Sequence, residues 1–361
     1  MTPLNIPFKQ SFKHASAERH MTQSVWVEAA SATGHRGYGE GCPRDYVTGE
    51  TTASALTFFR TIHDAVSAID GLDELRDWVT NHSAQIDTHP AAWCAVELAL
   101  LDVIAKERGE SVETLLSLPS IAGPFHYTAV LGAEKPEIFE QQLTRYLKIG
   151  FRDFKVKLAG DPAADQGRLS AVKARGSTIR SLRLDANNLW ADSASARDYL
   201  RSLDHSAFAI EEPLSVGDFH GLRQIAVATG LRIILDESFL RLSQFKNLTP
   251  DVSPWIINLR ISKMGGLIRS LAAAGQATRS NIPLIVGCQV GETSFLTRAA
   301  LTLVQSMNAE NVIGQEGAFG THLLARDVVE SPLMFGACGS LDVTPYGFAD
   351  GLGFGLNPTS G

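Results

Sequence analysis

Short apolar runs that end in charged residues recur between positions 151 and 266 at a nearly constant interval. The charged ends are Lys157, Asp185, Glu211, Asp236 and Lys263, and the steps from each to the next are 28, 26, 25 and 27 residues. One strand, one helix and two loops occupy about this length. The pattern predicts a (β/α)8 barrel whose strands end in charged residues at a common face.

Eight apolar runs predict barrel strands, and the segments between them have the three- and four-residue hydrophobic spacing of helices. The predicted strands are His126–Leu131, Asp153–Leu158, Leu182–Asp185, Phe208–Glu211, Ile233–Asp236, Trp255–Leu259, Leu284–Gly287 and Val312–Glu316. The predicted helices are Glu137–Ile149, Ala164–Arg175, Ala194–Leu203, Phe219–Thr229, Leu267–Arg279 and Thr297–Met307. No helix of comparable length separates the fifth and sixth strands, so we expect that unit to be abbreviated around Leu242–Leu248.

The first 122 residues have a different pattern. Ser24–Ala30 and the Gly-rich GHRGYGEG segment predict two antiparallel strands. Helical spacing follows over Thr51–Ile69, Leu72–Asn81 and Pro90–Lys106. Strands followed by helices without alternation indicate an α+β domain. We therefore predict an α+β domain at 1–122, the barrel at 123–327, and a C-terminal segment at 328–361 that packs back on the first domain.

Composition and charge exclude several classes of protein. The 361 residues are 44% hydrophobic and 20% charged, which indicates a globular protein with a large core. A net charge of −7 without any Lys/Arg cluster argues against a nucleic-acid partner. The most apolar helical run, Trp93–Ala105, contains two acids and is shorter than the roughly 20 residues of a membrane span. No signal peptide is evident, and four scattered cysteines indicate reduced, buried thiols and a cytoplasmic location.

Three carboxylates, those of Asp185, Glu211 and Asp236, end successive predicted strands. Each one alone would be interpreted as a solvated strand end, but their joint order favours a shared site. Magnesium prefers all-oxygen ligands, and carboxylates crowded together without a cation repel one another. We therefore expect these three residues to hold one divalent metal ion. The neighbouring polar residues predicted to orient the ligands are Asn187, Glu212 and Glu237. Strand alternation leaves open which of Glu211 and Glu212 faces inward.

Three lysines complete the predicted site. Lys155 and Lys157 are two apart on one strand and share a face, so their ammonium groups are expected to lower each other's pKa. A lysine near neutrality is a usable general base. Lys263 is predicted at the opposite side of the mouth, so a substrate would lie between Lys157 and Lys263. This arrangement suits removal of a proton α to a carboxylate. Each lysine alone is more often a solvated surface residue, and Lys155 is also open to a purely electrostatic role.

The segments FKVK, LDANN, IEEP, LDES and ISKMGG, in this order, resemble the motifs of the enolase superfamily, specifically its muconate lactonizing enzyme subgroup. GYGEG and AAWCAVELALLDVIAK resemble the family's capping domain. The resemblance implies a modified TIM (β/α)8 barrel with an α+β capping domain. It also implies one Mg²⁺ per chain, with Mn²⁺ as the alternative, held by Asp185, Glu211 and Asp236. Lys157 matches the family's base, and Lys263 matches the lysine before the Gly-Gly pair. The mandelate racemase branch needs a histidine base, and PLIVGCQVGETS contains none.

The resemblance implies an isomerase that removes the α-proton of a small carboxylate substrate to give a metal-stabilised enediolate. The leading hypothesis is a racemase or epimerase of an amino-acid derivative or dipeptide, with Lys157 and Lys263 on opposite faces. The alternatives are a muconate-type cycloisomerase and a dehydrating lyase of the o-succinylbenzoate synthase type. A non-catalytic barrel would predict a broken motif, and none of the five is broken. A homo-oligomer is expected by resemblance alone.

Substrate recognition is expected at two capping-domain segments, His14–Gln23 and Cys42–Glu50. They contain Arg19, Arg44 and Tyr46, which are candidates for contact with a polar substrate group; for each arginine alone, a solvated loop residue is at least as good an interpretation. In the family's epimerases of Ala-Glu, an Asp-x-Asp pair near the eighth strand holds the substrate ammonium. The corresponding IGQEGAFG segment offers only Glu316, which weakens that assignment. Glu292 is a further candidate near the site.

Overall fold

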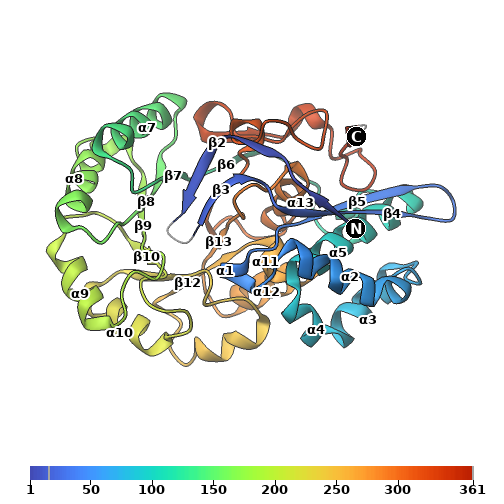
Figure 1. Cartoon of the computed structure of the whole chain (residues 1–361), viewed down its shortest axis with the longest axis horizontal. Helices are drawn as coiled ribbons and strands as arrows, with labels where there is room; N and C mark the ends of the chain where they lie inside the picture. The colour runs from blue at the N-terminus through green and yellow to red at the C-terminus, as the bar shows by residue number, and fades with distance from the viewer. Residues whose placement is uncertain (15–16, 360–361) are drawn as a thin grey trace.

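The computed structural model describes residues 1–14 and 17–359. Its middle and C-terminal parts form a ring of strands surrounded by helices; most N-terminal elements lie beside this ring, and the strands β2 (Pro7–His14) and β3 (Ala17–Met21) cross it in the view of Figure 1. Within the described residues, no helix is long and apolar enough to cross a membrane.

Eight parallel strands form one sheet in the order β14-β13-β12-β11-β10-β9-β8-β7. They are β7 (Ala129–Leu131), β8 (Asp153–Lys157), β9 (Ser181–Asp185), β10 (Ala209–Glu211), β11 (Arg232–Leu235), β12 (Trp255–Leu259), β13 (Leu284–Val286) and β14 (Val312–Gln315). A backbone hydrogen bond of 2.7 Å from Thr128 N to Gln315 O joins the two end strands. This bond closes the sheet, and the predicted barrel with its capping domain is confirmed.

Helices alternate with the strands as predicted. They are α7 (Pro136–Ile149), α8 (Pro162–Lys173), α9 (Ser193–Ser202), α10 (Phe219–Thr229), α12 (Leu267–Arg279) and α13 (Ser294–Gln305). Asp161, Asp192 and Asp218 begin three of these helices, because each carboxylate accepts a backbone N–H of the first turn. The unit expected to be abbreviated contains only the 3-10 helix η2 (Leu242–Asn247).

The N-terminal strands form a three-stranded antiparallel sheet of β1 (Thr2–Leu4), β4 (Ser24–Ala30) and β5 (Arg36–Gly41), and a separate hairpin of β2 (Pro7–His14) and β3 (Ala17–Met21). The helices that follow are α1 (Asp45–Thr48), α2 (Thr52–Val66), α3 (Leu72–Asn81), α4 (Ser83–Thr88), α5 (Pro90–Arg108) and α6 (Val112–Leu115). The alternate glycines of β5 let α5 approach closely: a Cβ at Gly39 would lie 2.1 Å from Ala95 O. The GYGEG motif is therefore a helix-packing surface.

The C-terminal segment returns to the N-terminal elements. The backbone N of Gly353 donates to Glu110 O, and Phe354 N donates to the carboxylate of Asp102 on α5. The remaining short elements are β6 (Pro124–His126), β15 (Ser340–Asp342), α11 (Ile261–Met264) and the 3-10 helices η1 (Gly176–Thr178), η3 (Gly320–His322), η4 (Ala337–Gly339) and η5 (Thr344–Tyr346). The division at residues 122 and 327 stays a prediction.

Two expectations about this part of the chain are wrong. The first predicted strand, His126–Leu131, is split, because β6 pairs with β15 whereas β7 pairs with β8. The cysteines are free thiols, but they are not all buried: Cys338 is exposed and Cys288 is partly exposed.

Buried carboxylates of the N-terminal elements bind the N-termini of barrel helices. Glu40 of β5 accepts hydrogen bonds from the backbone N (3.0 Å) and Oγ1 (2.6 Å) of Thr293, which precedes α13. Glu97 of α5 accepts a 2.9 Å bond from Ile268 N in the first turn of α12. Unpaired N–H groups and a partial positive charge at helix N-termini favour carboxylates. These bonds fix the capping elements to the barrel.

Replacing Gly266 by Ala is expected to weaken this attachment. Gly266 has φ 101° and ψ −179°, a conformation that is essentially restricted to glycine, and a Cβ would lie 2.3 Å from Glu97 Oε1. We expect the free energy of unfolding to fall by about 2 kcal/mol more than in Gly230→Ala, measured by denaturant unfolding. Gly230 is the matched control, because its φ is 74° and no atom lies within 4 Å of a Cβ there. Equal losses would contradict a role for the Glu97 contact.

Candidate active site

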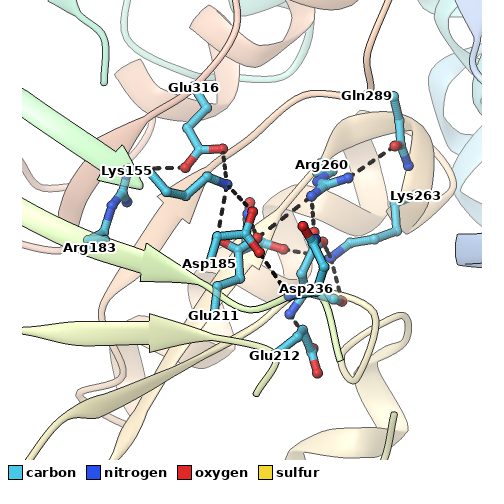
Figure 2. Close-up of polar contacts among 12 residues, drawn as sticks. Lys155, Arg183, Asp185, Glu211, Glu212, Asp236, Arg260, Lys263, Gln289 and Glu316 are labelled. Atoms are coloured by element: carbon cyan, nitrogen blue, oxygen red, sulfur yellow. Dashed lines mark hydrogen bonds and ion pairs between the residues drawn. The ribbon is translucent and has the colours of Figure 1, made fainter. Parts of the chain in front are cut away.

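The carboxyl ends of three adjacent strands bring the predicted acids together. In the sheet register, Asp185 on β9 lies opposite Lys157 on β8 and Glu211 on β10. Asp236 follows Leu235, the last residue of β11. Figure 2 shows Asp185, Glu211 and Asp236 gathered at one mouth of the barrel. Parallel strands explain this convergence, because their carboxyl ends meet at the same edge.

Lys155 lies among these carboxylates and is only 4% exposed. Its Nζ donates to Glu211 Oε2 (3.1 Å) and Glu316 Oε2 (2.8 Å) and lies 3.6 Å from Asp185 Oδ2. Burial alone would lower the pKa of Lys155, but the charges of Glu211, Glu316 and Asp185 outweigh it and raise the pKa above its ordinary value. The pKa of Lys155 is therefore raised, and not lowered as expected, because carboxylates surround its ammonium group.

Lys157 occupies the same mouth. Its Nζ donates to Asn187 Oδ1 (2.8 Å) and forms an ion pair with Asp185 Oδ2 (3.3 Å). Asn187 has φ 46°, a left-handed conformation that Asn adopts more readily than most residues, and its backbone N donates to Asp185 Oδ1 (3.2 Å). Asn187 thus contacts both Lys157 and Asp185, as its predicted orienting role requires.

Lys263 reaches the site from a helix, which corrects its predicted place on a strand. It lies on α11, one turn that follows β12 and ends at Gly265. Its Nζ is fully buried and donates to Asp236 O (2.8 Å), Asp236 Oδ1 (2.8 Å) and Asn258 O (2.7 Å). Burial and the nearby Arg260 guanidinium lower the pKa of Lys263. Lys155 and Lys263 approach the carboxylates from opposite sides (Figure 2).

Glu212 points away from the mouth, whereas Glu211 points into it. The φ of Glu212 is 37°, and this left-handed turn directs its carboxylate to the loop after β11. There it accepts the backbone N of Asp236 (2.7 Å), the backbone N of Ser238 (2.8 Å) and Ser238 Oγ (2.8 Å). Glu212 therefore holds the backbone that carries Asp236. Glu237, the third predicted orienting residue, is buried, and burial together with Glu212 raises its pKa.

The three carboxylates fit a divalent ion by chemistry. They supply hard oxygen ligands of the kind that Mg²⁺ prefers. Arg260 forms an ion pair with Asp236 and lies 3.8 Å from Glu211 Oε1, while Lys155 contacts Glu211 and Asp185. In this arrangement, no group of three or more His, Cys, Asp or Glu residues within 1–14 and 17–359 is placed to hold a metal ion. Side-chain cations here supply the positive charge that the acids require, and the ligand roles remain a prediction.

Three residues predicted to contact substrate bind neighbouring protein groups. Arg44 is fully buried, and its guanidinium donates to Pro43 O (2.7 Å), Thr22 O (3.1 Å) and Val290 O, so it joins capping segments to the loop after β13. Glu316 binds Lys155 and Arg183, each through a different oxygen. Glu292 accepts the backbone N of Gln289 (2.6 Å), and burial raises its pKa to about 8. Each of these side chains is bound to neighbouring protein groups, and its contact with a substrate stays a prediction.

The other two substrate candidates lie together on the capping domain. The Arg19 guanidinium stands 5.5 Å from the centre of the Tyr46 ring and donates to Gln23 Oε1. Their contact with a substrate stays a prediction. The predicted segment His14–Gln23 includes residues 15–16, which lie outside the described residues, and strand β3. The segment Cys42–Glu50 contains helix α1.

Sequence reasoning missed several polar residues of the site. Arg183 alternates with Asp185 on β9, and Asn258 lies inside the apolar run of β12. Arg260 follows that run and also donates to Gln289 Oε1 (3.0 Å). The only available signal was alternation on β9, because a residue two positions before a mouth-facing acid shares its face.

Comparisons with known proteins identify the family. A sequence model described as "Enolase C-terminal domain-like" matches residues 139–360. The N-succinyl-L-Arg/Lys racemase of Bacillus cereus is 26% identical over 342 residues, which cover 92% of this chain and 86% of that protein.

Two solved structures share the fold. One is a dipeptide epimerase from Enterococcus faecalis V583 complexed with Mg and the dipeptide L-Leu-L-Tyr, with a TM-score of 0.85, 24% identity and coverage of 99% of this chain and 98% of that one. The other is a muconate lactonizing enzyme from Pseudomonas fluorescens complexed with muconolactone, with a TM-score of 0.84, 23% identity and coverage of 98% and 94%. The resemblance found in the motifs is confirmed, and magnesium occurs among the structural neighbours.

Replacing Glu212 by Ala is expected to loosen the loop that carries Asp236. The change leaves the backbone N–H groups of Asp236 and Ser238 buried without an acceptor, at about 1–3 kcal/mol each. We expect the free energy of unfolding to fall by several kcal/mol and Mg²⁺ affinity, measured by calorimetry, to fall about tenfold or more. Ser238→Ala is the milder matched variant, since both backbone bonds to Glu212 remain. Unchanged Mg²⁺ affinity in Glu212→Ala would show that Glu212 does not orient Asp236.

Proposed function

Because this chain belongs to the enolase superfamily, we propose that it is a Mg²⁺-dependent racemase or epimerase that removes the proton α to a carboxylate. The proposed substrate is an amino-acid derivative or a dipeptide, since the relatives include an N-succinylamino acid racemase and a dipeptide epimerase. The observation that carries the proposal is the pair of lysines at one carboxylate cluster, with Lys157 beside Asp185 and Lys263 beside Asp236.

Each group has a role in this reaction. A substrate carbon between Lys157 and Lys263 loses its proton to one amine and receives a proton from the other, which inverts the centre. Lys155, kept cationic by its carboxylate neighbours, stabilises the negative charge that develops on the substrate carboxylate. When bound by Asp185, Glu211 and Asp236, Mg²⁺ would add positive charge beside the same carboxylate. Asn187 orients Lys157 through its 2.8 Å contact.

One observation favours a second candidate, a cycloisomerase or a dehydrating lyase that needs a single base. An ammonium group has three N–H donors, and the three donor contacts of Lys263 are all made to Asp236 and Asn258. A lysine held in this way serves as a fixed cation. The two candidates therefore differ in whether Lys263 exchanges a proton with the substrate.

Deuterium exchange separates them. Incubated in ²H₂O with Mg²⁺ and a panel of N-acylated amino acids and dipeptides, the protein is expected to place deuterium at the α-carbon of both stereoisomers, followed by NMR. Lys263→Ala is expected to stop stereoisomer interconversion, because one acid/base is missing, while exchange of one stereoisomer continues. Lys157→Ala is expected to retain exchange of the opposite stereoisomer only. The second candidate would be favoured if Lys157→Ala, but not Lys263→Ala, lost exchange of both stereoisomers. An alkene or lactone product would favour it as well.

Replacing Asp236 by Asn tests the metal assignment. Loss of one anionic ligand is expected to weaken Mg²⁺ binding by about 100-fold or more, measured by calorimetry, and to abolish Mg²⁺-dependent turnover. The matched control is Asp153→Asn at the opposite, amino end of β8, where the carboxylate pairs with Arg180. Circular dichroism is expected to show both variants folded. Undiminished Mg²⁺-dependent turnover in Asp236→Asn would contradict the assignment.

A further inference from the structure

Arg183 lies inside the barrel at the point where the sheet closes. It is two residues before Asp185 on β9, so both side chains point to the same interior, and it is 1% exposed. Its Nη2 donates to Thr128 Oγ1 (2.8 Å) and to Glu316 Oε1 (3.0 Å). Thr128 precedes β7 and Glu316 follows β14, the two ends of the sheet. Arg183 therefore reaches both ends from the third strand of the barrel.

The space for this guanidinium comes from Gly314 on β14. A Cβ at Gly314 would lie 2.6 Å from Arg183 Nη1 and 3.2 Å from its Cζ. The register of β14 also shifts against β13 between Leu284 and Ile285, a local irregularity of the kind often found at barrel rims and beside active sites. A side chain at position 314 would displace Arg183, so the close approach requires glycine.

Glu316 connects Arg183 to Lys155 at the mouth of the barrel. Its Oε1 accepts from Arg183, and its Oε2 accepts from Lys155 at 2.8 Å (Figure 2). Lys155 is thereby shared between Glu316 on one side and the candidate metal ligands Glu211 (3.1 Å) and Asp185 (3.6 Å) on the other. Charge-assisted bonds of this kind are strong and directional. A Glu316 carboxylate that lost its hold on Lys155 would leave the ammonium group to Glu211 and Asp185.

We propose that Arg183 is a positioning residue for the reaction: it orients Glu316, and Glu316 holds one side of the Lys155 ammonium group, so that this group is shared with Glu211 and Asp185 rather than bound by them alone and stays in place for the substrate carboxylate. The inference rests on the proposed function for the role of Lys155. It differs from a purely structural role, in which Arg183 only closes the barrel between Thr128 and Glu316. The two roles predict different behaviour in a double-mutant cycle.

The cycle uses Arg183→Met, Glu316→Gln and the double variant, with Thr128→Val as the matched control that removes only the structural contact at the closure. In the exchange assay, each single variant is expected to lower kcat about 10- to 100-fold with KM changed less than about threefold, because Lys155 acts on charge that develops in the transition state. The double variant is expected to lie within about threefold of the more affected single variant. Thr128→Val is expected to lower the melting temperature and leave kcat unchanged.

Calorimetric Mn²⁺ binding to the metal-free protein gives a readout that needs no substrate. Positioning predicts that Arg183→Met and Glu316→Gln both weaken Mn²⁺ binding several-fold, because Lys155 then competes for Glu211 and Asp185. Charge alone predicts opposite effects: loss of the arginine would strengthen binding, and loss of the glutamate would weaken it.

Three results would each overturn the inference. They are tighter Mn²⁺ binding in Arg183→Met, multiplicative losses of kcat in the double variant, and a kcat loss in Thr128→Val equal to that of Arg183→Met. If the wild-type protein shows no α-proton exchange, the proposed function fails, and the Mn²⁺ cycle still decides on Arg183. If Arg183→Met does not fold, Arg183→Lys, which keeps the charge without the forked geometry, takes its place under the same kcat, double-variant and Thr128→Val criteria. With Arg183→Lys in the cycle, the inference is supported if both single variants bind Mn²⁺ more weakly than the wild-type protein. It is overturned if Arg183→Lys binds Mn²⁺ as tightly as the wild-type protein does.

Discussion

The site depends on the need to balance negative charge at the mouth of the barrel. The parallel register forces Asp185 and Glu211 to adjacent positions, and Asp236 follows on the next strand. All three are buried, and buried charges are stable only when they are paired. Lys155, Lys263 and Arg260 provide the pairing, so the arrangement of cations is a condition of folding as much as of catalysis. The proposed Mg²⁺ and anionic substrate would enter a mouth whose carboxylates are already paired with these cations.

Charge balance also explains how the capping elements are attached. Glu40 and Glu97 bring carboxylates into the interface with the barrel, where helix N-termini meet them, and Arg44 brings a guanidinium to backbone carbonyl groups. In each case a buried charge binds backbone groups that secondary structure leaves unpaired. These contacts therefore define where the capping elements meet the barrel.

The strand-end pattern was enough to predict the barrel, because strand length and helix length repeat along the chain. The same pattern identified Asp185, Glu211 and Asp236, since one edge of a parallel sheet collects the strand ends. It did not reveal the partners of Lys155, because Glu316 is 161 residues away and nothing local marks the contact. The choice between Glu211 and Glu212 depends on the left-handed backbone at Glu212, which the sequence pattern does not show. The helical turn that carries Lys263 directly follows an apolar strand, so the pattern did not separate the turn from the strand. Arg44 resembled an exposed loop residue, and only its burial revealed a structural role.

The position of Lys263 links acid placement to proton transfer. Its ammonium group binds the carboxylate and the backbone oxygen of Asp236 as well as Asn258 O. A lysine acts as a base only when it is neutral. Burial beside Arg260 lowers the pKa of Lys263 and favours the neutral form, whereas the 2.8 Å ion pair with the Asp236 carboxylate favours the charged form. A cation that binds Asp236 more strongly than Lys263 does would weaken the effect of the Asp236 carboxylate on Lys263. The effect of burial beside Arg260 would remain. In the proposed reaction, the acid that helps to balance charge at the mouth would therefore also affect whether the Lys263 amine can take a proton from the substrate.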